Sequence, residues 1–230
     1  MKICGFEKFS MVDYDGLIAC TVFTEGCNFV CPFCQNSSLA LNNIHNDYID
    51  QQEIIDYLTK RKGLVDAVCI SGGEPTLQKD LEEFIITIKN LGYKVKLDTN
   101  GQNPTKLLDL INKKLIDYVA MDIKNNLVKY GITIGINNFD TTNIQKSVEI
   151  IKTSGIAHEF RTTLVGQYHS ISDIEEIAKW LEGEEKYYLQ HFVDSGSCIK
   201  DGLTEVDKDT AIKMQNIASK YIKNVNLRGY

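Results

Sequence analysis

Three cysteines within eight residues carry the clearest chemical signal in this sequence. Cys27, Cys31 and Cys34 have the spacing C-x3-C-x2-C, and no fourth cysteine lies close by. A cubane iron–sulfur cluster has four irons and is normally held by four thiolates, so three thiolates would leave one iron open to a ligand other than protein. A structural zinc site fits less well, because it requires four closed ligands, usually in repeated C-x2-C pairs. The spacing therefore predicts one 4Fe–4S cluster per chain.

The same spacing has a second interpretation, because positions i, i+4 and i+7 share one face of a helix, where cysteine packs as a small hydrophobic residue. Pro32 stands between the second and third cysteines, where it would remove an interior hydrogen bond and clash with the preceding turn. Gly26 precedes the first cysteine and suits a loop that wraps around a ligand. Both residues favour a ligand loop over a buried helical stripe.

Other polar motifs stand at the ends of short apolar runs. They are Ser71-Gly72-Gly73-Glu74-Pro75, Asp98-Thr99-Asn100-Gly101 and Met121-Asp122-Ile123-Lys124. Paired glycines leave room for the backbone to approach a ligand closely. A carboxylate such as Glu74 at the end of a buried strand needs a partner, and the amine of a bound ligand would supply one. These motifs predict a ligand pocket beside the cysteines.

The cysteine loop, with Phe33 before its last cysteine, resembles the signature of the radical S-adenosylmethionine (radical SAM) superfamily, C-x3-C-x-aromatic-C. The glycine-glycine-glutamate motif resembles the superfamily's second signature. The Asp98–Gly101 and Asp122–Lys124 segments are similar to those of glycyl-radical-enzyme activating enzymes, above all the activating proteins of anaerobic ribonucleoside-triphosphate reductases. The likeness runs from about Phe6 to the C-terminus, and several motifs in the same order are more specific than one alone.

This resemblance implies a cofactor and a set of contacts. S-adenosylmethionine (SAM) would chelate the open iron through its amine and carboxylate, with Phe33 near the adenine and backbone around Gln35 at the adenine edge. Glu74 would face the amine, Asn100 the ribose or carboxylate, and Lys124 and Arg161 the carboxylate or a substrate peptide. The full expected set of cofactor-binding residues is Phe33, Gln35, Gly72, Gly73, Glu74, Asp98, Asn100, Asp122, Lys124 and Arg161.

Further expectations concern Asp98 and Asp122, whose carboxylates could hold a monovalent cation between them or compensate the nearby cations. His191 ends an expected strand, but a lone histidine is weak evidence and we leave it outside the site. The resemblance implies a protein substrate, a glycyl radical enzyme, and an electron donor of the flavodoxin or ferredoxin type. Pyruvate formate-lyase-type partners stay open, because much of the motif set is shared.

Two other functions fit parts of the sequence. A small-molecule radical SAM enzyme, such as a 7-carboxy-7-deazaguanine synthase, shares the compact length and the cysteine spacing. An iron–sulfur redox sensor or electron carrier would use the cysteines alone. The Asp98–Gly101 and Asp122–Lys124 segments favour an activating enzyme over the first, and the expected ligand pocket argues against the second, because a carrier needs no such pocket.

The elements that must position these residues alternate between short β-branched runs and amphipathic helical patterns, which is typical of a parallel sheet. Six strands are expected, with a possible short seventh at 225–227, and helices between them. Six βα units in 230 residues are too few for a closed eight-stranded barrel, which takes about 250 residues. They predict a partial (β/α)6 TIM-like barrel with every motif at the C-terminal end of a strand. The expected strands are 17–23, 67–70, 95–98, 118–122, 159–164 and 187–191.

Composition sets the remaining expectations. A chain of 230 residues with 43% hydrophobic content can bury one full core, so we expect a single domain over 1–230. Net charge −6 and pI near 5.3 disfavour a nucleic-acid or anionic-membrane surface. An apolar run long enough to span a bilayer and a signal-peptide core are both absent. Seven cysteines is an odd count that argues against a disulfide framework, so a cytoplasmic, anaerobic setting is expected.

Overall fold

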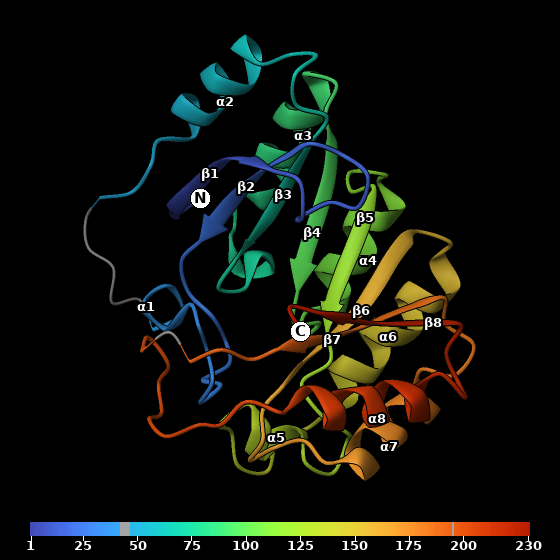
Figure 1. Cartoon of the computed structure of the whole chain (residues 1–230). Helices are drawn as coiled ribbons and strands as arrows, with labels where there is room; N and C mark the ends of the chain where they lie inside the picture. Colours follow the sequence, from blue (N-terminus) through green and yellow to red (C-terminus); the bar gives the residue numbers. More distant parts are fainter. Residues whose placement is uncertain (42–46, 195) are drawn as a thin grey trace.

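One eight-stranded sheet organises the chain, which is described at residues 1–41, 47–194 and 196–230 of a computed structural model (Figure 1). The strands follow one another in chain order across the sheet. The first pair is antiparallel, and every later neighbouring pair is parallel. The strands are β1 (Ile3–Ser10), β2 (Ala19–Thr24), β3 (Ala67–Gly72), β4 (Lys94–Thr99), β5 (Tyr118–Asp122), β6 (Ala157–Leu164), β7 (Lys186–His191) and β8 (Asn224–Arg228).

Helices cover the outer face of this sheet and connect its parallel strands (Figure 1). Their apolar stripes pack on the outward strand residues to form the main hydrophobic core, which includes Val68, Ile70, Phe84 and Ile85. The helices are α1 (Ser37–Ala40), α2 (Gln51–Lys60), the 3₁₀ turn η1 (Pro75–Leu77), α3 (Leu81–Asn90), α4 (Pro104–Asn112), α5 (Tyr130–Thr133), α6 (Thr142–Ser154), α7 (Ile171–Trp180) and α8 (Lys208–Ala218). In the part of the chain that the structure describes, no helix is long and apolar enough to cross a membrane.

The inner face of the sheet is polar. Because side chains alternate between the two faces of a strand, residues 96 and 98 of β4 and 159 and 161 of β6 point to the same side. Lys96 accordingly lies 3.6 Å from Asp98 and 3.7 Å from Glu159, and Arg161 lies 4.0 Å from Glu159. Each buried charge on this face has an opposite charge beside it, as burial of ions requires. The concave side is therefore a charged interior.

The connection between β1 and β2, residues 11–18, crosses this concave side. Asp13 accepts a hydrogen bond from the Thr21 hydroxyl at 2.6 Å, and its carbonyl accepts one from the Lys96 ammonium. Two residues later, Asp15 accepts a hydrogen bond from the Tyr188 hydroxyl of β7 at 3.0 Å. The segment thus ties β2 to the far side of the sheet, although β1 and β8 do not pair.

The six expected strands are all present, and the short run at 225–227 is the strand β8. The sequence did not predict β1, an edge strand that pairs antiparallel with β2. Asp50 caps α2, with its side chain accepting a hydrogen bond from the backbone amide of Gln52. The connection 125–140 contains the single-turn helix α5. The partial barrel of α/β units is therefore confirmed, with one extra strand at its first edge.

Candidate functional site

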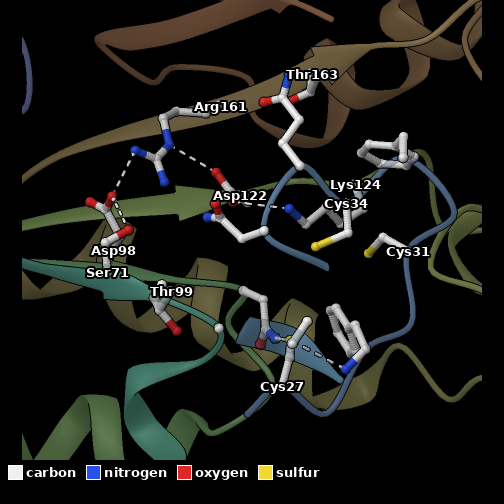
Figure 2. A pocket seen from close by; sticks show the side chains of 18 of the residues that line it. Cys27, Cys31, Cys34, Ser71, Asp98, Thr99, Asp122, Lys124, Arg161 and Thr163 are labelled. Atoms are coloured by element: carbon white, nitrogen blue, oxygen red, sulfur yellow. Dashed lines mark hydrogen bonds and ion pairs between the residues drawn. The ribbon is translucent and has the colours of Figure 1, made fainter. Parts of the chain in front are cut away.

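A cavity of about 410 Å³ opens at the C-terminal ends of the parallel strands, within the range of small-molecule sites. Figure 2 shows its wall: the cysteine loop lies on one side and the strand-end residues face it. All three cysteines line it, as do nine of the ten residues expected to contact a cofactor: Phe33, Gln35, Gly72, Gly73, Asp98, Asn100, Asp122, Lys124 and Arg161. The tenth, Glu74, does not. The segments that the sequence singled out therefore meet at one cavity.

Backbone hydrogen bonds fix the cysteine loop. Gly26 donates to the Leu39 carbonyl at 2.8 Å, and Val30 donates to the Ile134 carbonyl at 3.1 Å. On its other side, the Gly26 carbonyl accepts from the backbone amide of Glu74 at 2.7 Å. The loop is thus attached both to the glycine-glycine-glutamate turn and to the connection after β5.

All three cysteines line the cavity, and Figure 2 shows them on the loop that faces the strand ends. Burial raises the pKa of the Cys31 thiol to about 12 and raises the pKa of Cys27 and Cys34 as well. The Lys124 ammonium lowers the pKa of all three, without cancelling the effect of burial. Without a metal these thiols are protonated near neutral pH, and a metal that binds them must release protons.

The arrangement fits a cluster better than a single ion. Among residues 1–41, 47–194 and 196–230, no three Cys, His, Asp or Glu side chains gather as they would around one metal ion. In a cubane each thiolate binds a different iron, so the sulfurs line a shared space without converging on one point. Cys69, in contrast, is fully buried within β3, and burial raises its pKa well above the ordinary value. Three thiols of one loop are the donor set that a cluster with an open iron needs.

Gly72 and Gly73 let the backbone of the turn after β3 touch the cysteine loop. A Cβ on Gly73 would lie 2.1 Å from the Gly26 carbonyl oxygen, and one on Gly72 would lie 2.3 Å from the Thr24 nitrogen. Gly72 also has φ of +110°, which residues with a side chain rarely adopt. A larger residue at Gly73 would have to move the cysteine loop, and one at Gly72 would have to move the end of β2.

Glu74 is the one expected ligand contact that the geometry does not support. Its side chain is fully buried. It accepts hydrogen bonds from the Thr76 and Thr99 hydroxyls at 2.5 and 2.9 Å. It also accepts from the backbone amides of Thr76 and Asn100 at 3.1 and 2.7 Å. Burial raises the pKa of Glu74, and these hydrogen bonds partly offset it. With its oxygens used in this way, Glu74 joins two turns and does not reach the cavity.

Asn100 is held by that contact and reaches the cysteine loop. Its amide nitrogen donates to the Asn28 side-chain oxygen at 2.7 Å and lies 3.8 Å from the Cys27 sulfur. Its own oxygen accepts from the Gln102 backbone amide at 3.0 Å. The expected contact with a ribose or carboxylate is therefore joined by a contact to the cluster-ligand loop that sequence spacing did not indicate.

Four charged side chains form one network across the strand ends (Figure 2). Arg161 donates from Nε to Asp122 at 2.8 Å and from a terminal nitrogen to Asp98 at 3.2 Å, and Lys124 donates to Asp122 at 2.9 Å. Burial alone would raise the pKa of Asp122, but Arg161 and Lys124 lower it to about 2. The neighbouring carboxylate likewise raises the pKa of Lys124 despite burial. Asp122, Lys124 and Arg161 are therefore ionised near neutral pH.

This network bears on the expected monovalent cation. The Arg161 guanidinium bridges the carboxylates of Asp98 and Asp122, which is the position where a cation was expected. A side chain thus supplies positive charge between the two carboxylates.

The remaining expected contacts lie at the edge of the cavity. Phe33 is buried and packs its ring against Tyr168 and Phe192, with centroids 5.9 and 6.5 Å apart. Gln35 donates from its side chain to the Val193 carbonyl at 2.8 Å. Its side chain thus attaches the cysteine loop to the segment that follows β7.

Six polar residues of the cavity wall are absent from the expected site list: Asp13, Asn36, Ser71, Thr99, Thr163 and Gln190. Thr163 could have been found, because it follows Arg161 by two residues on one strand and so shares its face. Gln190 lies one residue before His191 on β7, and it is Gln190 that lines the cavity. His191 instead contacts Glu205 at 2.6 Å outside the cavity.

Comparison of the whole sequence with known proteins identifies the family of this chain. The model of the radical SAM superfamily matches residues 21–181. The chain belongs to the radical SAM superfamily. A Methanocaldococcus jannaschii protein provisionally described as a glycyl-radical enzyme activating enzyme is 35% identical over 240 residues, which cover 98% of this chain and 95% of that protein. A second M. jannaschii protein with the same description is 29% identical over 214 residues, 90% of this chain and 79% of that protein.

Solved radical SAM structures share the fold. Streptococcus suis SuiB bound to S-adenosylmethionine superposes with a TM-score of 0.71 at 17% identity over 90% of this chain and 49% of SuiB, so this chain spans about half the length of SuiB. The enzyme anSMEcpe with bound AdoMet gives a TM-score of 0.53 at 18% identity over 72% of this chain and 48% of its own. At these identities the likeness shows the fold alone. Membership of the superfamily implies SAM and a 4Fe–4S cluster, and the three thiols and adjoining cavity fit both.

Proposed function

We propose that this protein is a glycyl-radical-enzyme activating enzyme, with residues 1–230 as one radical SAM domain. Its proposed substrate is a glycine in a loop of a partner enzyme, most simply an anaerobic ribonucleoside-triphosphate reductase. A flavodoxin- or ferredoxin-type protein would supply the electron. The observation that supports this function best is the similarity, over 98% of the chain, to a protein described as an activating enzyme.

The geometry adds support, because an electron carrier needs no ligand cavity and this protein has one beside its three thiols. When bound, a reduced cluster and SAM supply methionine and a 5′-deoxyadenosyl radical that takes one hydrogen atom from the substrate. Cys27, Cys31 and Cys34 would hold the cluster, and Lys124 lies where it can attract a carboxylate. Gly72 and Gly73 present bare backbone at the same wall. Asp98 and Asp122 hold the Arg161 guanidinium in place.

The test is an anaerobic mixing experiment. Reconstituted protein, SAM and reductant are combined with the reductase, and the glycyl radical is measured by electron paramagnetic resonance. We expect a doublet signal that is absent from a Gly→Ala variant of the partner's radical glycine, with one methionine released for each radical formed. Silence with this reductase and with pyruvate formate-lyase-type partners, together with turnover of a small purine precursor, would replace the proposal with the small-molecule alternative.

A further inference from the structure

Thr163 and Gln190 form a neutral polar pair on the cavity wall to which no role has yet been given. They are register partners on the neighbouring strands β6 and β7, and both line the cavity. Because they stand opposite each other in a parallel ladder, their side chains project side by side. Among the described residues, neither side chain has a hydrogen-bond partner.

Three other polar groups of the cavity wall are already engaged. The Ser71 hydroxyl donates to Asp98 at 3.0 Å, the Thr99 hydroxyl to Glu74 at 2.9 Å, and the Asn100 amide to Asn28 at 2.7 Å. The charged residues form the network around Arg161. Thr163 and Gln190 therefore hold free hydrogen-bonding capacity on a half-buried wall, where polar groups normally have partners.

The chemistry of the pair matches a peptide backbone. A primary amide offers both donors and an acceptor, and a threonine hydroxyl offers one donor and two lone pairs. A peptide unit offers one donor and one acceptor. Glycine has no side chain, so an enzyme that binds a glycine loop must recognise its peptide groups. Uncharged groups also suit this task, because a peptide unit carries no net charge.

The position of the pair suits a macromolecular substrate. Gln190 pairs with Arg228 of β8, and β8 is the last strand of a sheet that does not close onto β1. A loop of a folded partner must reach the cavity from outside the sheet, and Gln190 lies one strand from its last edge. We propose that Thr163 and Gln190 bind the backbone of the partner's glycine-bearing loop. This inference rests on the proposed function.

The test separates substrate binding from cofactor binding. Gln190→Leu, Thr163→Val and the double variant keep side-chain size and lose hydrogen-bonding groups. Binding of a synthetic peptide carrying the partner's glycine loop is measured by calorimetry on anaerobically loaded protein with SAM and no reductant. We expect the peptide Kd to rise about tenfold in the double variant, as the loss of two hydrogen bonds implies, with SAM Kd unchanged within about twofold. Gln145→Leu, on the exposed face of α6, is the matched control and should change neither constant.

Radical formation supplies the second readout. The partner concentration that gives half-maximal glycyl radical should rise in parallel with the peptide Kd, while 5′-deoxyadenosine release without partner should stay the same. An unchanged peptide Kd in the double variant overturns the inference, and so does a matching loss of SAM affinity, which would assign the pair to the cofactor. If the unmodified protein generates a radical in no glycyl radical enzyme, the proposed function is wrong and so is this inference. If the unmodified protein is active but the variants bind the peptide as tightly as it does, only the inference is wrong.

Discussion

Replacement of Gly73 by alanine is the sharpest test of how the two loops of the site fit together. The added Cβ would lie 2.1 Å from the Gly26 carbonyl oxygen and 2.7 Å from its carbon. Both contacts are with backbone, so no side-chain rotation relieves them. The loop must move by about 1 Å to reach a tolerable separation, and the same carbonyl accepts the 2.7 Å hydrogen bond from Glu74.

The magnitude follows from these contacts. Overpacking of a tight site costs about 1–3 kcal/mol, and the weakened backbone hydrogen bond adds about 1 kcal/mol. We therefore expect Gly73→Ala to lower the free energy of unfolding of the metal-free protein by about 2–4 kcal/mol. Because Cys27 follows Gly26 directly, the displaced loop should also hold less iron after anaerobic reconstitution.

Urea denaturation of the metal-free protein and iron analysis of the reconstituted protein measure the two effects. Gly63→Ala is the control, because Gly63 also has an unusual backbone, φ of +82°, but has nothing within 4 Å of an added Cβ. It should lose about 1 kcal/mol from backbone strain and retain full iron content. A Gly73→Ala protein as stable and as rich in iron as the control would refute the close fit described here.

Three other predictions concern the thiols and the charge network. Cys31→Ala should abolish iron binding after reconstitution while Cys69→Ala retains it, and equal iron loss in both would contradict the assignment of the cysteine loop. Burial would raise the pKa of Asp122, but Arg161 and Lys124 lower it from 3.8 to about 2. The ionised carboxylate therefore stabilises the fold above pH 3.8, and this contribution is lost as the pH falls toward 2. Acid titration of stability should show a loss of about 1–2 kcal/mol that Asp122→Asn lacks, and parallel curves would contradict it. Arg161→Met should lower the free energy of unfolding by about 3–5 kcal/mol, since it leaves two inward carboxylates without their shared partner, whereas Arg161→Lys should lose less; denaturant melts that show equal losses would argue against the two-carboxylate bridge.

The sequence was most informative where chemistry is local. The cysteine spacing, the paired glycines and the strand-end motifs predicted which segments meet, because the C-terminal ends of parallel strands share one edge of the sheet. Thr163 followed the same two-residue alternation as Arg161 and could have been predicted from it. Prediction of Gln190 would have required the register of its strand to within one residue. Sequence reasoning considered the adjacent His191 instead.

Other features depend on backbone geometry that spacing does not encode. Whether the Glu74 carboxylate faces the cavity or the opposite side of its turn is decided by the conformation of that turn, which buries it against Thr99 and Asn100. β1 has mixed burial along its length and lacks the apolar run that indicates a buried strand. Asp13 reaches the cavity only because the whole 11–18 connection crosses the concave side of the sheet.

The attachment of the cysteine loop has a consequence for how the site matures. Gly26 and Cys27 donate backbone hydrogen bonds to Leu39 and Ala40, and Val30 donates to Ile134, so three backbone hydrogen bonds hold the loop without using a thiol. In a zinc finger, by contrast, the metal supplies the free energy that folds the peptide. In this protein the backbone hydrogen bonds of the loop supply part of that free energy, and loading must also remove protons from buried thiols. The affinity for a cluster should therefore rise with pH, because the thiols bind metal only as thiolates.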